Sequence, residues 1–225
     1  MNKKENILVL VGSPKGASST SNSLGDYLIS RLEQSGLTVG KEYIYKLVRK
    51  EEDQKKLLTK VEEAGMIILV FPLYVDCLPA GVIKALELIA DHRKLKSHRE
   101  KQGFAIIINC GFPEAQHNNT AIAICKIFSR EVGFEWHGAL SLGMGGAIGG
   151  RSLEERGGMV RNVIKGLDLA AQALAEGKHI PDEAVELFEK KFIPITLYTK
   201  MGNLGWNQQA KKYGVRKKIK DQPYL

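Results

Sequence analysis

Hydroxyl and amide side chains crowd one short segment near the start of the chain. After the apolar run ILVLV and Gly12, residues 13–23 contain Lys15 and seven short polar side chains, namely Ser13, Ser18, Ser19, Thr20, Ser21, Asn22 and Ser23. Such side chains cap helix N-termini, where unpaired backbone N–H groups and a partial positive charge bind anions. The segment therefore predicts a phosphate-binding loop between a buried strand and a helix, with residues 21–23 as the first candidates.

Two well-known glycine motifs are absent from this segment. Neither G-x-x-x-x-G-K-S/T nor G-x-G-x-x-G occurs in residues 7–23. This disfavours a P-loop nucleotide site and a dinucleotide-binding Rossmann site. Taken alone, the segment is also consistent with an ordinary strand-to-helix loop that contains several redundant capping residues.

A second segment, PLYVDCLP at residues 72–79, offers different chemistry. Pro72 ends an apolar strand, Tyr74 presents an aromatic face, and Pro79 opens the next helix. The backbone amides of residues 73–76 are therefore expected in a non-helical loop against which a flat heteroaromatic ring can lie. The alternative is a surface tyrosine between two prolines that only shape a turn.

Alternating strands and helices must position these loops. Strands are expected at residues 7–11, 38–45, 66–71, 104–109 and 136–142, and helices at 24–35, 51–64, 80–92, 120–132 and 159–176. Five such strand–helix units predict an α/β fold with a flavodoxin-like, five-stranded, doubly wound parallel sheet of strand order 2-1-3-4-5. In this fold the ligand binds at the carboxyl ends of the strands, where the first and third strands meet. Loops 13–23, 72–79 and 110–119 converge there, and the glycine-rich residues 143–158 are expected as a mobile loop at the same rim.

GSPKG and SNS after the first strand, with PLY and PAGVIKALE after the third, resemble the flavodoxin-like NAD(P)H-dependent FMN reductase family. The resemblance covers roughly residues 5–175 by element order, and the family is close to the iron–sulfur flavoproteins. It implies FMN as cofactor and NADPH or NADH as co-substrate. Lys15 stands where the family commonly has arginine, and GASST lengthens the loop.

The resemblance also implies site residues. The phosphate loop would bind FMN through Ser13, Lys15, Thr20, Ser21, Asn22 and Ser23. The third-strand loop would contact the isoalloxazine ring through Pro72, Leu73, Tyr74, Val75 and Asp76. Gly111 and Phe112 would flank the other edge of the ring. No catalytic acid or base is required, because the protein mainly orients the flavin.

The three cysteines exclude several cofactor classes. Cys77, Cys110 and Cys125 are scattered and form no C-x-x-C pair. The compact cysteine cluster of iron–sulfur flavoproteins is missing, so the sequence predicts no iron–sulfur cluster, no metal site and no disulfide framework.

Charge and hydropathy limit the kinds of partner that the protein is expected to have. The chain has 225 residues and a net charge of +8. No apolar run approaches the roughly 20 residues of a membrane span, which predicts a cytoplasmic protein. The last fifteen residues are rich in basic side chains, namely Lys211, Lys212, Arg216, Lys217, Lys218 and Lys220. A solvated extension is favoured over a nucleic-acid-binding tail, because no nucleic-acid motif accompanies these residues.

The expected organisation is a flavodoxin-like FMN-binding domain at residues 1–178 and a helical, basic extension at 179–225. Apolar residues of the extension predict packing against its own domain or a neighbouring subunit, and hence a homo-oligomer, a dimer or tetramer. The leading functional hypothesis is an FMN-dependent NAD(P)H oxidoreductase that reduces a small acceptor such as free flavin or a quinone. The alternatives are a flavodoxin-type electron carrier and a flavin-free protein that binds an anionic ligand or nucleic acid.

Overall fold

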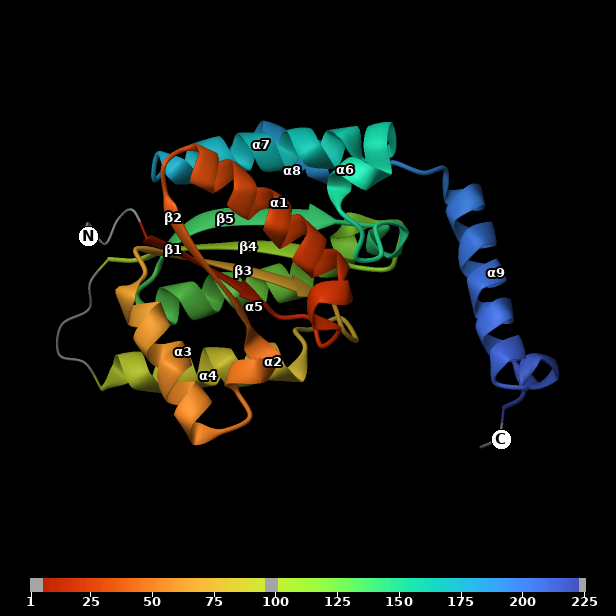
Figure 1. Ribbon diagram of the computed structural model, residues 1–225, viewed down its shortest axis with the longest axis horizontal. Coiled ribbons are helices and arrows are strands. Elements are labelled where there is room, and N and C mark those ends of the chain that lie inside the picture. Colours follow the sequence, from red (N-terminus) through yellow and green to blue (C-terminus); the bar gives the residue numbers. More distant parts are fainter. Residues whose placement is uncertain (1–5, 96–100, 223–225) are drawn as a thin grey trace. The chain divides into compact units, whose positions relative to one another are not determined.

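A computed structural model describes residues 6–95 and 101–222. Residues 1–5 and 96–100 of the predicted flavin-binding domain and residues 223–225 of the predicted extension lie outside the described residues. The chain forms one five-stranded parallel sheet of order β2-β1-β3-β4-β5, which confirms the predicted fold (Figure 1). The strands are β1 (Asn6–Val11), β2 (Thr38–Tyr43), β3 (Met66–Pro72), β4 (Gly103–Asn109) and β5 (Glu135–Leu142).

Helices cover both faces of this sheet. On one face lie α1 (Thr20–Gln34), α6 (Leu153–Arg156), α7 (Arg161–Ala175) and α8 (Asp182–Glu189), and on the other lie α2 (Ile44–Leu47), α3 (Glu51–Glu63), α4 (Ala80–Lys94) and α5 (Asn119–Val132). Short 3₁₀ turns are η2 (Gly16–Ser18), η3 (Ala115–Asn118), η4 (Gly145–Ala147) and η5 (Gly157–Val160).

The apolar strands are buried because each face of the sheet has its own core. Val9 of β1 packs into the cluster under α1 and α7, while Leu8 and Leu10 pack into the cluster under α3 and α4. A strand covered on both sides has no solvent-facing positions. This explains why the run ILVLV shows no alternation of polar and apolar residues.

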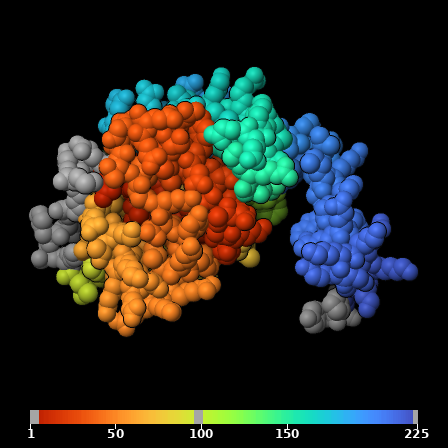
Figure 2. Space-filling view, in the orientation of Figure 1, coloured from red at the N-terminus to blue at the C-terminus, as the bar shows by residue number. Residues whose placement is uncertain are grey.

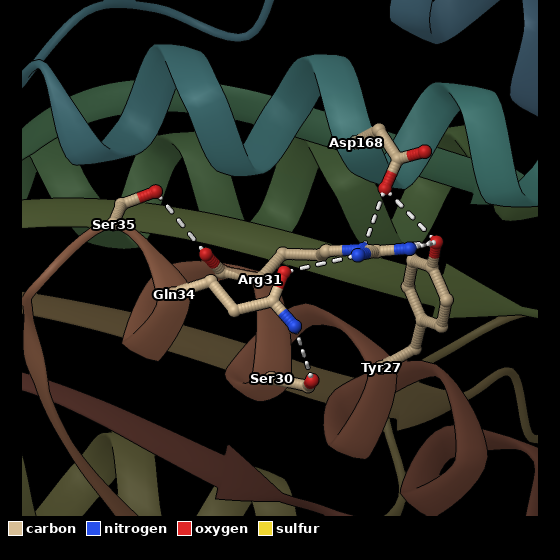
Figure 3. A network of polar contacts seen from close by, with 6 residues as sticks. All are labelled: Tyr27, Ser30, Arg31, Gln34, Ser35 and Asp168. Atoms are coloured by element: carbon tan, nitrogen blue, oxygen red, sulfur yellow. Dashed lines mark hydrogen bonds and ion pairs between the residues drawn. The ribbon is translucent and has the colours of Figure 1, made fainter.

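Helix α1 begins at Thr20 rather than near residue 24, because Ser19 caps it. A polar network joins α1 to α7 (Figure 3). The Tyr27 hydroxyl donates to Asp168 Oδ1 at 2.9 Å, and Arg31 Nε lies 2.9 Å from the same oxygen. Burial raises the pKa of Tyr27, so its hydroxyl stays protonated as a donor. Arg31 and Asp168 remain partly exposed, so their ion pair adds little to the free energy of unfolding.

Two compact units make up the chain, Met1–Phe192 and Ile193–Leu225. The first unit includes α8, which packs on α7. The second contains α9 (Ile195–Lys212) and η6 (Arg216–Lys218). Several of its apolar side chains are exposed, including Trp206 at 66%. No helix in the described part of the chain is both long enough and apolar enough to span a membrane.

Candidate functional site

A cavity of about 250 Å³ lies at the carboxyl ends of β1, β3 and β4, where the strand order reverses. We call it the switch-point hollow. It brings together eight residues predicted from sequence, namely Ser13, Lys15, Thr20, Ser21, Pro72, Leu73, Tyr74 and Gly111. Its other lining residues are Ser18, Ser19, Asn109, Cys110, Gly145, Gly146 and Gly149.

Residues 13–23, the hydroxyl loop, place the N-terminus of α1 at this hollow. The Ser19 hydroxyl accepts a hydrogen bond from the Asn22 N–H at 3.1 Å, and the Ser19 carbonyl accepts one from the Ser23 N–H at 3.1 Å. The Thr20 and Ser21 N–H groups have no acceptor among the described residues. Both residues line the hollow, so two free backbone donors and the positive end of a 15-residue helix are available to an anion.

Side chains add further donors at the same end of the hollow. Ser21 is fully buried, and its Oγ accepts a hydrogen bond from Asn109 Nδ2 at 2.8 Å, which leaves the Ser21 hydroxyl hydrogen free to donate. Lys15 is exposed at the rim and forms no ion pair with any described residue. Ser13 and Ser18 contribute two more hydroxyl groups. Together these groups form a donor-rich pocket that suits a phosphate.

The glycine-rich loop after β5 is bonded to the hydroxyl loop. Thr20 Oγ1 donates to the Gly145 carbonyl at 2.7 Å and accepts from the Gly149 N–H at 3.2 Å. A Cβ at Gly150 would lie 2.6 Å from the Ser18 carbonyl carbon, so the two backbones touch. Figure 2 shows the teal segment around residue 150 lying against the red N-terminal part of the chain. Glycine is needed at this position because a larger residue would force the loops apart.

Residues 72–79, the third-strand loop, end in a tight hairpin. Tyr74 and Cys77 exchange two backbone hydrogen bonds of 2.9 and 3.0 Å. Between them, Val75 and Asp76 have φ values of 49° and 54°. This conformation matches a two-residue primed turn, and it is strained for a β-branched valine. The Val75 side chain is 98% exposed, and the N–H groups of Val75 and Asp76 donate to no described residue.

Other predicted site residues lie elsewhere. The Asn22 amide donates to Asp26 at 2.8 Å and accepts from the Tyr43 hydroxyl at 2.8 Å. Asn22 and Ser23 line a separate hollow of about 180 Å³ along α1. The side chains of Val75 and Asp76 project from the hairpin tip and do not line the switch-point hollow.

Phe112 also lies outside the lining of the switch-point hollow. It is half-exposed, and its ring stacks on His117 with a centroid distance of 4.1 Å. The next loop holds it in place, because the Met144 N–H donates to the Phe112 carbonyl at 2.7 Å. Its neighbour Gly111 does line the hollow.

Sequence reasoning did not single out Asn109, which connects two loops. Its Nδ2 donates to Ser21 Oγ and to the Phe71 carbonyl. The available signal was one amide residue at the end of the otherwise apolar strand GFAIIIN. Cys110 follows it, and burial raises the pKa of the Cys110 thiol, which keeps this lining group neutral. Among the described residues, no group of three or more His, Cys, Asp or Glu side chains is arranged to hold a metal ion.

Comparison with known proteins found similarity in structure and not in sequence. The sequence matches no protein-family model and no curated protein. An FMN-dependent NADH-azoreductase from Bacillus anthracis str. Ames Ancestor, in complex with FMN, is 14% identical with a TM-score of 0.56, over 76% of this chain and 99% of that chain. The fold is flavodoxin-like.

Two further solved structures are similar to this chain in fold. A flavodoxin from Streptococcus pneumonia TIGR4 is 17% identical with a TM-score of 0.51, over 76% of this chain and 99% of that chain. The rubredoxin oxygen:oxidoreductase from Desulfovibrio gigas is 12% identical with a TM-score of 0.54, over 77% of this chain. This chain spans only 36% of the length of that enzyme. Such low identities establish a shared fold, and function has to be argued from the site.

Proposed function

We propose that this protein is an FMN-dependent NAD(P)H oxidoreductase that passes electrons to a small acceptor such as free flavin or a quinone. The switch-point hollow carries the proposal, because an anion-binding helix terminus and an aromatic loop line the same cavity. Ligands of doubly wound sheets bind at this position. The FMN-dependent azoreductase fold found by comparison adds support at the level of architecture.

The phosphate of FMN fits the donors at the start of α1. It would accept hydrogen bonds from the Thr20 and Ser21 N–H groups and from the Ser21 hydroxyl. Lys15 would add a positive charge at the rim, as a point charge rather than a planar fork. Asn109 keeps Ser21 in place through the 2.8 Å hydrogen bond, so it acts as a positioning residue.

The ring of FMN fits the third-strand loop. Pro72, Leu73 and Tyr74 line one wall of the hollow and would provide apolar and aromatic contact with the ring. Val75 and Asp76 lie outside the lining of the hollow, at the adjacent hairpin tip, and their free N–H groups would donate to polar edge atoms of a ring that extends to this tip. When bound, FMN supplies the redox chemistry, taking a hydride from a nicotinamide and passing electrons to the acceptor.

The same binding residues also suit a flavodoxin-type electron carrier, and a flavodoxin is among the similar folds. The net charge of +8 disfavours this alternative, because the carriers that it would resemble are typically acidic. We further propose that residues 1–178 form the FMN-binding domain, that the remainder serves assembly into a homo-oligomer, and that the protein acts in the cytoplasm.

The test is a visible spectrum of the purified protein before and after anaerobic addition of NADPH or NADH. An oxidoreductase shows bound flavin absorbance that bleaches within seconds. A carrier binds FMN but is not bleached by either nucleotide. A colourless protein that fails to take up added FMN would exclude both functions.

A further inference from the structure

A second cavity lies beside the hydroxyl loop, and no step of the proposed function uses it. It measures about 420 Å³ and is lined on one side by residues of the 13–17 segment. The end of β2, α2 and the turn that follows line the other side. We call it the basic hollow. Its volume lies within the range of small-ligand sites.

Three cations surround the basic hollow. Lys46, Arg49 and Lys50 are exposed and line it. Arg49 and Lys50 form no ion pair within residues 6–95 and 101–222. Asp53 also lines the hollow, but its carboxylate lies 3.0 Å from Lys56 Nζ. The free charge facing the hollow is therefore positive, and it attracts a phosphate rather than a cation.

Two tyrosines give the same hollow aromatic walls. Tyr43 is fixed by its hydrogen bond to Asn22, and Lys46 Nζ lies 5.1 Å from its ring centroid. The Tyr45 hydroxyl accepts a hydrogen bond from the Gly81 N–H at 3.4 Å, at the start of α4. Lys41 Nζ also lies 5.1 Å from the Tyr43 ring centroid, so cations already cover that ring, and Tyr45 is the wall that suits a ligand that is itself aromatic. The lining thus matches a ligand with both a heteroaromatic ring and a phosphate group.

Ser13 lines both cavities, so the basic hollow and the switch-point hollow are separated only by the hydroxyl loop. A dinucleotide whose nicotinamide reaches the switch-point hollow can extend over this loop. We propose that the basic hollow binds the 2′-phosphoadenosine half of NADPH, with Lys46, Arg49 and Lys50 on the 2′-phosphate. This inference rests on the proposed function, and it selects NADPH over NADH because NADH lacks the 2′-phosphate.

Calorimetric titration of the FMN-loaded protein with 2′,5′-ADP and with 5′-ADP tests the site without turnover. Both probes carry two phosphate groups, but only the first has one on the 2′-oxygen. We expect 2′,5′-ADP to bind about tenfold more tightly, as for one charge-assisted hydrogen-bonded contact. The variant K46Q/R49Q/K50Q should lose this preference. The control K84Q/K126Q/K165Q removes as many exposed charges from other helices and should keep it.

Steady-state kinetics provide the second readout. The K46Q/R49Q/K50Q variant should raise KM for NADPH with kcat unchanged, and leave KM for NADH unchanged, because the lost contact lies away from the reacting ring. Equal binding of the two probes, or an equal loss in the control variant, would overturn the inference. Failure to take up FMN would instead refute the proposed function. Titration of the FMN-free protein with the same probes would still test whether the basic hollow prefers 2′,5′-ADP to 5′-ADP.

Discussion

The hydroxyl loop and the third-strand loop line the same hollow, but the protein holds them by different means. The hydroxyl loop is bonded to distant parts of the chain, through Thr20 to Gly145 and through Ser21 to Asn109. The third-strand loop is closed mainly by the Tyr74–Cys77 pair, and its tip is strained and exposed. A phosphate has one fixed shape and charge, so a rigid pocket binds it without losing entropy on ordering. Strain at the tip of the second loop is typical of a contact site.

The largest expected contrast is in thiol chemistry. Burial raises the pKa of Cys125 from 9.0 to about 12, and burial also raises that of Cys110. At pH 8 Cys125 should therefore form about a thousandfold fewer thiolates than an ordinary thiol. Cys77, partly exposed in the third-strand loop, should be the one residue that Ellman's reagent modifies rapidly.

The variant Cys77→Ser should remove this fast phase, and persistence of the phase would contradict the contrast.

The pKa shift of Cys125 also has a consequence for stability. The folded-state pKa of Cys125 lies above the unfolded value, so the unfolded state loses its proton first as pH rises. The free energy of unfolding should then decrease between about pH 9 and pH 12.

Next in size is the substitution Gly150→Ala, which tests how tightly the hydroxyl loop is packed. The new Cβ would lie 2.6 Å from the Ser18 carbonyl carbon, at a φ of +78°. We expect a loss of about 2–4 kcal/mol in the free energy of unfolding, with loss of FMN affinity. Urea denaturation and fluorescence titration with FMN measure the two effects. Gly177→Ala is the control, because this residue follows the end of α7 with φ +68° and has no neighbour within 4 Å, and it should cost about 1 kcal/mol.

A smaller effect is expected for Asn109→Leu, which removes the support of Ser21 while keeping the side-chain size. The loss of a buried hydrogen bond should weaken FMN binding by about tenfold or more. Asn119→Ala, at an exposed position in the first turn of α5, should leave FMN affinity unchanged. Unaltered affinity in Asn109→Leu would mean that Ser21 needs no positioning.

The smallest expected effect concerns the tip of the third-strand loop. Val75→Asn places a residue that tolerates positive φ at 49°, and should raise the free energy of unfolding by about 0.5–1 kcal/mol. Leu95→Asn, at an exposed position with φ −77°, should give no such gain. A destabilised Val75→Asn protein would show that the tip is not strained.

Strands and helices could be predicted from periodicity, because apolar runs and helical stripes are local patterns. Five such units in alternation then indicated the sheet order. The side-chain partners were not predictable in the same way. Asn22 has the residue type of a phosphate ligand, yet it accepts a hydrogen bond from the hydroxyl of Tyr43, the last residue of β2. Asn109 reaches Ser21 only after the sheet has formed. The positive φ of Val75 goes against its residue type, so no local rule predicts it.

Thr20 and Gly145 are 125 positions apart in the chain, yet one hydrogen bond joins them. A ribosome delivers the hydroxyl loop early and the glycine-rich loop only after four more strands have been made. The pocket therefore cannot be completed while the chain is still short. Capture of the ligand should coincide with the last stage of folding, so flavin uptake by a growing chain would report that its fifth strand has joined the sheet.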